Sequence, residues 1–85
     1  VVDRTFIDSN NVRWIVDYKT SSPAAGEDLQ VFITAAKALY REQVEFYLTL
    51  LRERDSLAQH RDISEYRCAL YFPTIDYLAL YADIP

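Results

Sequence analysis

The sequence predicts an α/β domain in which a β-hairpin, a long helix and two further strands form one sheet flanked by the helix. Residues 1–7 and 12–19 are rich in Val, Ile, Thr, Trp and Tyr, as are residues 66–72 and 77–82. Between them, residues 27–57 carry apolar side chains at helical spacing. No internal repeat interrupts the order β-β-α-β-β, so we expect one compact unit.

Composition sets the class of protein. The chain has 85 residues, of which 51% are hydrophobic and 14% aromatic, so it should fold, as a single domain with a small core. Its one cysteine, Cys68, excludes a disulfide framework, a thiolate zinc site and an iron–sulfur cluster. No apolar run reaches the ~20 residues of a membrane span and no secretion signal is visible, so we expect a cytoplasmic protein without a membrane partner.

Net charge limits how the chain can meet nucleic acid. The formal charge is −4 and the pI is near 4.8. Because Lys and Arg contacts to phosphates supply most non-specific affinity, DNA must be delivered or held by something else. The chain also opens on a strand-like run without Met, and we expect it to be part of a longer polypeptide.

The first hairpin turns at Asp8-Ser9-Asn10-Asn11, which is turn chemistry without Gly or Pro. A three-residue loop with Asn11 in the left-handed region pairs Asp8 with Val12. This register places Asp3 opposite Asp17.

The helix is expected to follow the strand-breaking stretch 20–26 and to begin at Glu27 and Asp28, acids suited to a first turn. A bend near residues 35–37 is an alternative to one straight helix. One inward stripe is predicted, with Gln43 as its single polar amide: Leu29, Phe32, Ile33, Ala36, Tyr40, Gln43, Tyr47, Leu50 and Leu51.

A candidate metal site lies at the end of the second strand. Alternate residues share a face of a strand, so Asp17 and Lys19 point the same way, and the hairpin register adds Asp3. Two carboxylates suit Mg²⁺, a hard ion that prefers oxygen ligands. With a lysine beside them, they suit phosphodiester hydrolysis, where bound water is activated and phosphoryl charge neutralised.

An isolated Asp-x-Lys is far more often a solvated strand end, because exposed charge pairs carry little energy. Here the pair ends an apolar strand, Trp14-Ile15-Val16, and a second acid-bearing strand precedes it. That context favours the catalytic interpretation.

Five segments carry a resemblance to a known family. They are Val2-Asp3-Arg4, Trp-Ile-Val-Asp-Tyr-Lys-Thr-Ser at 14–21, Gly-Glu-Asp-Leu at 26–29, Gln-Val-Glu-Phe-Tyr at 43–47 and Ala-Leu-Tyr-Phe-Pro at 69–73. In this order, over most of the chain, the sequence resembles the nuclease domain of RecB-type and UvrD/Rep-related helicase–nucleases. These are a branch of the PD-(D/E)XK superfamily, with the restriction-endonuclease-like fold.

The resemblance implies a role for each matching residue. Asp3 and Asp17 correspond to the metal-binding carboxylates, Lys19 to the active-site lysine, and the main-chain carbonyl of Tyr18 to a further metal ligand. Gln43 and Tyr47 match a helical Q-x-x-x-Y motif associated with DNA handling. A structural alternative for these two stays open, in which Tyr47 packs between helix and sheet and Gln43 satisfies a backbone group.

The function implied is that of a Mg²⁺-dependent exonuclease domain in DNA repair and recombination, acting on DNA, with single strands as the expected form. A helicase motor in cis or in trans would feed the strand and use the ATP, since this chain has no Walker A sequence. Residues 1–85 would be the C-terminal portion of the domain, without the family's upstream helix and its Glu or His ligand. Two alternatives are a non-catalytic DNA-guiding or docking module of the same fold and a free-standing endonuclease or resolvase; relatives with an iron–sulfur cluster are excluded by the single Cys.

Overall fold

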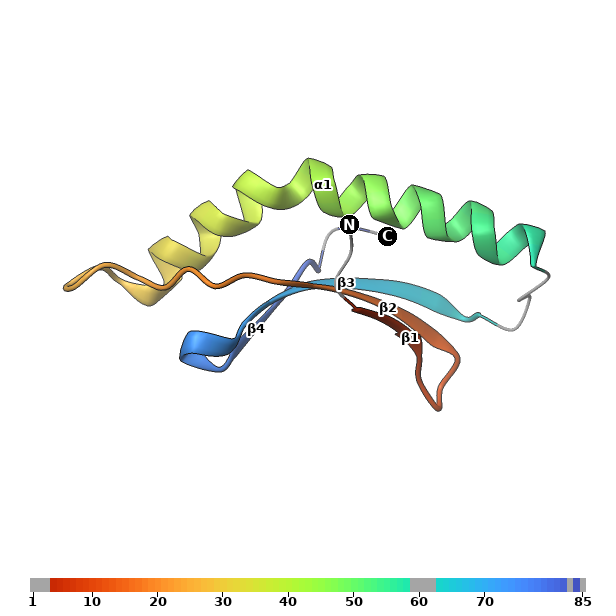
Figure 1. Cartoon of the computed structure of the whole chain (residues 1–85), viewed down its shortest axis with the longest axis horizontal. Helices are drawn as coiled ribbons and strands as arrows, with labels where there is room; N and C mark the ends of the chain where they lie inside the picture. Colours follow the sequence, from red (N-terminus) through yellow and green to blue (C-terminus); the bar gives the residue numbers. More distant parts are fainter. Residues whose placement is uncertain (1–3, 59–62, 83, 85) are drawn as a thin grey trace.

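The computed structural model describes residues 4–58, 63–82 and 84, which form a four-stranded mixed sheet with one long helix across one face (Figure 1). This confirms the α/β class and the order of elements. The strands are adjacent in chain order, β1-β2-β3-β4. The elements are β1 (Arg4–Ile7), β2 (Val12–Tyr18), α1 (Leu29–Leu57), β3 (Glu65–Phe72), the short 3₁₀ helix η1 (Pro73–Ile75) and β4 (Tyr77–Leu80).

The hairpin has the predicted register over its described length. β1 and β2 are antiparallel, from Arg4 opposite Val16 to Ile7 opposite Arg13. Asn11 takes the left-handed conformation, with φ of 62°, and the Asp8 amide donates to the Val12 carbonyl at 3.0 Å. Asp3 lies outside the described residues, so its pairing with Asp17 stays a prediction.

The helix is continuous and begins two residues later than predicted. Asp28 is its N-cap, and the Asp28 carboxylate accepts a hydrogen bond from the Val31 amide at 3.1 Å. Gly26, with φ of 81°, supplies the left-handed turn just before the cap.

The predicted inward stripe of α1 is only partly right. Ile33, Ala36, Tyr47 and Leu51 are buried, and Phe32 and Tyr40 pack against the core, but Leu29, Gln43 and Leu50 are exposed. Val44 and Leu48 are buried in place of Gln43 and Leu50. The physical reason is the period: positions 36, 43 and 50 follow a seven-residue repeat, which drifts by about 20° per heptad on a straight helix.

The α1 crossover joins two parallel neighbours. β2 and β3 run parallel, with Trp14 opposite Arg67 and Asp17 opposite Leu70. β3 and β4 form an antiparallel hairpin whose turn closes at Asp76, a left-handed residue with φ of 49°. β3 begins one residue earlier than predicted, and β4 ends at Leu80 rather than at residue 82.

The two faces of the sheet differ in cover. The core lies between the sheet and α1, and it includes Ile15, Leu70, Phe72 and Cys68. The α1 helix lies on one side of the sheet only (Figure 1). Large apolar side chains are exposed on the strands, among them Phe6, Tyr18, Leu78 and Leu80.

Candidate functional site

Asp17 and Lys19 meet at the end of β2. The Lys19 amide donates to the Tyr71 carbonyl at 2.8 Å, which continues the ladder to β3 one residue past the strand. The Lys19 ammonium lies 3.0 Å from Oδ2 of Asp17. The Asp17 side chain is 4% exposed and that of Lys19 is 16% exposed, so this ion pair is largely shielded from solvent.

Tyr40 of α1 completes the surroundings of the ammonium. The Lys19 Nζ lies 3.8 Å from the centre of the Tyr40 ring. Sequence reasoning placed Tyr40 on the inward stripe but gave it no part in the site. No local sequence signal marks this contact, because it depends on how α1 lies across the sheet, with the early part of the helix over the carboxyl end of β2 (Figure 1).

Tyr18 points its side chain to the other face of the sheet. Tyr18 is 43% exposed, and its ring meets that of Tyr71 edge-on at 5.4 Å between ring centres. Because the Lys19 amide faces β3, backbone alternation directs the Tyr18 carbonyl toward the β1 side of β2.

Gln43 and Tyr47 are brought together by the structure. The Gln43 side-chain amide donates to the Tyr47 hydroxyl at 3.3 Å. Tyr47 belongs to the buried core between helix and sheet, whereas Gln43 is exposed. The packing predicted for Tyr47 under the structural alternative is therefore present, but the partner of Gln43 is the tyrosine rather than a backbone group.

The donor set at this end of β2 is made of oxygen. Asp17 offers a carboxylate and Tyr18 a carbonyl, which are the ligand types that Mg²⁺ takes alongside water and substrate phosphate. No group of three or more His, Cys, Asp or Glu side chains that could hold a metal occurs among residues 4–58, 63–82 and 84. The described donors thus fit Mg²⁺ in kind and supply one carboxylate.

A second charged cluster, which the sequence did not reveal, lies at the other end of the helix–sheet interface. Asp55 of α1 is 1% exposed and accepts two hydrogen bonds from the guanidinium of Arg13, one of them from Nε at 3.0 Å. The Tyr66 hydroxyl donates to the same carboxylate at 2.8 Å. Burial, and then the Asp55 carboxylate, raise the pKa of Tyr66 above its usual value.

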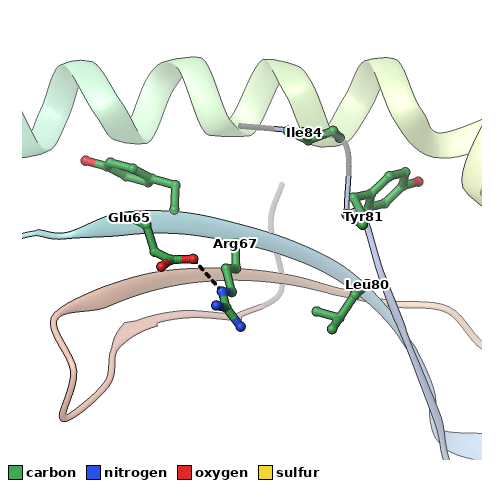
Figure 2. Close-up of a pocket in the computed structure, with 7 residues that line it drawn as sticks. Glu65, Arg67, Leu80, Tyr81 and Ile84 are labelled. Carbon is green, nitrogen blue, oxygen red and sulfur yellow. Dashed lines mark hydrogen bonds and ion pairs between the residues drawn. The ribbon is translucent and has the colours of Figure 1, made fainter.

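Two hollows lie away from Asp17 and Lys19. One, of about 310 Å³, is on the uncovered sheet face, lined by Arg4, Phe6, Trp14, Val16, Tyr18, Tyr71 and Leu78. The other, also about 310 Å³, lies beside the first residues of β3 (Figure 2). Glu65 and Arg67 form an ion pair at 2.6 Å in its wall, and Leu80, Tyr81 and Ile84 line the opposite side.

Two aromatic side chains on the uncovered face donate hydrogen bonds to carboxylates. The Trp14 indole donates to Asp8 at 2.9 Å, and the Tyr71 hydroxyl donates to Asp76 at 2.6 Å. The indole hydrogen bond lowers the pKa of Asp8, so this carboxylate is charged at neutral pH.

Comparisons with family models, with curated proteins and with solved structures found no match. Within the described residues, no helix has the length and apolar character needed to cross a bilayer.

Proposed function

We propose that this chain is the catalytic part of a Mg²⁺-dependent DNA nuclease of the exonuclease type, with the restriction-endonuclease-like fold. The observation that carries the proposal is the shielded pair of Asp17 and Lys19, whose charged atoms lie 3.0 Å apart at the end of β2. A carboxylate and an ammonium held side by side supply a metal ligand and a cation for phosphodiester hydrolysis.

Each residue has a distinct task. Asp17 would hold Mg²⁺ through its carboxylate, together with the Tyr18 carbonyl and with Asp3, which the sequence predicts to lie opposite Asp17. Mg²⁺ supplies activation of water and neutralisation of phosphate charge when bound. Lys19 orients the attacking water and stabilises the negative charge that develops on the phosphoryl oxygens.

DNA reaches the site with help from elsewhere. Gln43, exposed on α1 and bonded to Tyr47, is the proposed contact to the DNA strand. With a net charge of −4, the 85 residues alone should bind DNA weakly and cut it poorly. We therefore place them in a longer repair or recombination protein whose helicase motor, in cis or in trans, feeds single-stranded DNA.

The test is a pair of substitutions, Asp17→Ala and Lys19→Ala, in the complete polypeptide. Each should lower Mg²⁺-dependent cleavage by at least ~10²-fold, the scale of losing one preorganised electrostatic group. In Asp17→Ala, DNA affinity should stay constant or rise, because repulsion between carboxylate and phosphate is removed. Cleavage is measured with end-labelled single strands and affinity by fluorescence anisotropy.

Two exposed residues of α1 give charge-matched controls. Glu53→Ala removes a negative charge, as Asp17→Ala does, and Arg54→Ala removes a positive charge, as Lys19→Ala does. Both residues lie far along the helix, and both substitutions should leave cleavage unchanged. Circular single strands serve as a second substrate: their cleavage would assign a free-standing endonuclease instead of an exonuclease. If Asp17→Ala and Lys19→Ala both leave nuclease activity intact, the catalytic assignment is wrong.

A non-catalytic docking module is the second candidate, and the uncovered sheet face favours it. Tyr18, Leu78 and Leu80 are each more than 40% exposed there, and exposed apolar patches of this kind mark interaction sites. Retained cleavage in both variants, or no cleavage by the wild type, would select this candidate.

A further inference from the structure

The Lys19 ammonium has two neighbours from different elements of the fold. One is the Asp17 carboxylate, two residues earlier on β2, and the other is the ring of Tyr40 on α1. The carboxylate lies 3.0 Å from Nζ and the ring centre 3.8 Å from it. The lysine therefore spans the interface between strand and helix.

The ring contact is a close one. A cation within about 6 Å of an aromatic ring centre is attracted by the negative face of the ring, more strongly when water is excluded. The other cation–ring contacts of the described residues lie between 5.2 and 5.8 Å. At 3.8 Å, and with only 16% of the lysine side chain exposed, the Tyr40 contact is much the tightest of the set.

The two neighbours of Lys19 would serve at different stages of the proposed reaction. In the structure, Oδ2 of Asp17 holds the ammonium. If that carboxylate bound a divalent ion, its attraction for the ammonium would weaken. The lysine side chain, with four rotatable bonds and a strong affinity for water, would then need another contact to keep its position. The Tyr40 ring is not a metal ligand, so its contact with the ammonium persists when Asp17 binds metal.

We infer that Tyr40 is a positioning residue for Lys19: its ring face holds the ammonium next to the phosphate to be cleaved while Asp17 is engaged with metal. This inference rests on the proposed nuclease function. It adds that the catalytic lysine is placed by the helix and not only by its own strand. Docking of α1 on the sheet is then a condition for catalysis.

The test is to vary the electrostatics of the ring at constant shape in the complete polypeptide. Tyr40→Phe keeps a ring face and should retain kcat within about twofold of the wild type. Tyr40→Leu keeps an apolar side chain without a ring face, and kcat should fall about tenfold with little change in KM, since a misplaced group costs turnover more than binding. Phenylalanine with one to five ring fluorines at position 40, which progressively weakens the ring's negative face, should lower kcat stepwise between these limits.

A second readout does not depend on activity. In the proton NMR spectrum, the Lys19 methylene groups next to Nζ should be shifted upfield by the ring current of Tyr40, and this shift should vanish in Tyr40→Leu. Phe46→Leu is the control, because Phe46 is an aromatic residue of the same helix that is 60% exposed. It should change neither kcat nor the Lys19 signals.

The outcomes separate the inference from the function on which it rests. Equal kcat across the fluorinated series and in Tyr40→Leu, in a wild type that cleaves DNA, would overturn the role of Tyr40 and leave the nuclease assignment standing. Unshifted Lys19 signals in the wild type would overturn it as well. A wild type without Mg²⁺-dependent cleavage would remove the proposed function, and the role of Tyr40 with it.

Discussion

Two ion pairs lie on the helix-facing side of β2, one at each end of the strand, and they are built differently. Arg13 reaches across to Asp55 of α1, and the carboxylate also receives the Tyr66 hydroxyl of β3. Asp17 lies in β2 and Lys19 directly follows the strand, two residues further along the chain. The first cluster joins three elements through charge and hydrogen bonds, whereas the second ion pair forms within one segment and reaches the helix only through the contact of Lys19 with the Tyr40 ring.

This difference in partners indicates that one cluster stabilises the fold and the other is available for chemistry. The acceptor oxygens of Asp55 are committed to an arginine and a tyrosine, and the residue is 1% exposed. The two cations are similarly shielded, with 16% of the Lys19 side chain and 12% of the Arg13 side chain exposed, but the Lys19 ammonium is held by a carboxylate and a ring face rather than by two carboxylate oxygens. We interpret the Arg13–Asp55–Tyr66 cluster as the clamp that docks α1 and the Asp17–Lys19 pair as the reactive end.

The largest expected effect is on the clamp. Asp55→Ala leaves a buried guanidinium without its partner and should reduce the free energy of unfolding by about 3–5 kcal/mol. Urea denaturation followed by circular dichroism measures it. The double variant Asp55→Ala with Arg13→Leu should recover part of the loss, because the uncompensated charge is gone. A loss below about 1 kcal/mol in Asp55→Ala would show that the clamp does not hold the helix.

A smaller effect is expected at Tyr66. Tyr66→Phe removes one hydrogen bond to a charged group and should cost about 1.5 kcal/mol at pH 7. Because the pKa of Tyr66 is raised in the folded protein, the unfolded chain loses the phenol proton first as pH rises past its usual value of 10.0. The wild type should therefore lose stability relative to Tyr66→Phe from about pH 10 upward, as urea midpoints across pH 7 to 11 would show. Parallel pH curves for the two proteins would contradict this.

The smallest effect on stability is expected at the reactive end. Asp17→Ala should change the free energy of unfolding by about 1 kcal/mol, because the Lys19 ammonium keeps its contact with the Tyr40 ring, and some access to solvent, once its partner is gone. Cys68 gives an independent measure, since burial raises the pKa of its thiol to about 11 and the folded protein shields it from reagents. Labelling at pH 8 should be as slow in Asp17→Ala as in the wild type and much faster in Asp55→Ala. Fast labelling in both variants would erase the distinction between the two ends.

The strands and the hairpin register were accessible from the sequence because period-two patterning and turn chemistry are local signals. Asn11 illustrates this, as its tolerance of the left-handed region fixed the loop and hence the pairing of Arg4 with Val16. The face shared by Asp17 and Lys19 follows from the same alternation.

Features that depend on how α1 sits on the sheet were not accessible. The burial of Val44 and Leu48 is not predicted by a stripe with seven-residue spacing, because that spacing drifts around a straight helix away from the face that packs on the sheet. The contact of Asp55 with Arg13 spans 42 positions, and that of Tyr40 with Lys19 also joins helix to strand, so neither leaves a local pattern. Only the direction and rotation of the docked helix determine them.

The central claim is that the carboxyl end of β2 binds the catalytic metal and the clamp end does not. Mn²⁺, a paramagnetic substitute for Mg²⁺ with the same preference for oxygen ligands, can locate the ion by broadening nearby amide signals in the NMR spectrum. Substoichiometric Mn²⁺ should broaden the amides of residues 17–19 first, should leave those of Arg13 and Asp55 sharp, and should lose this selectivity in Asp17→Asn. Broadening that centres on Asp55 or on the outer surface of α1, or that is identical in Asp17→Asn, would contradict the account.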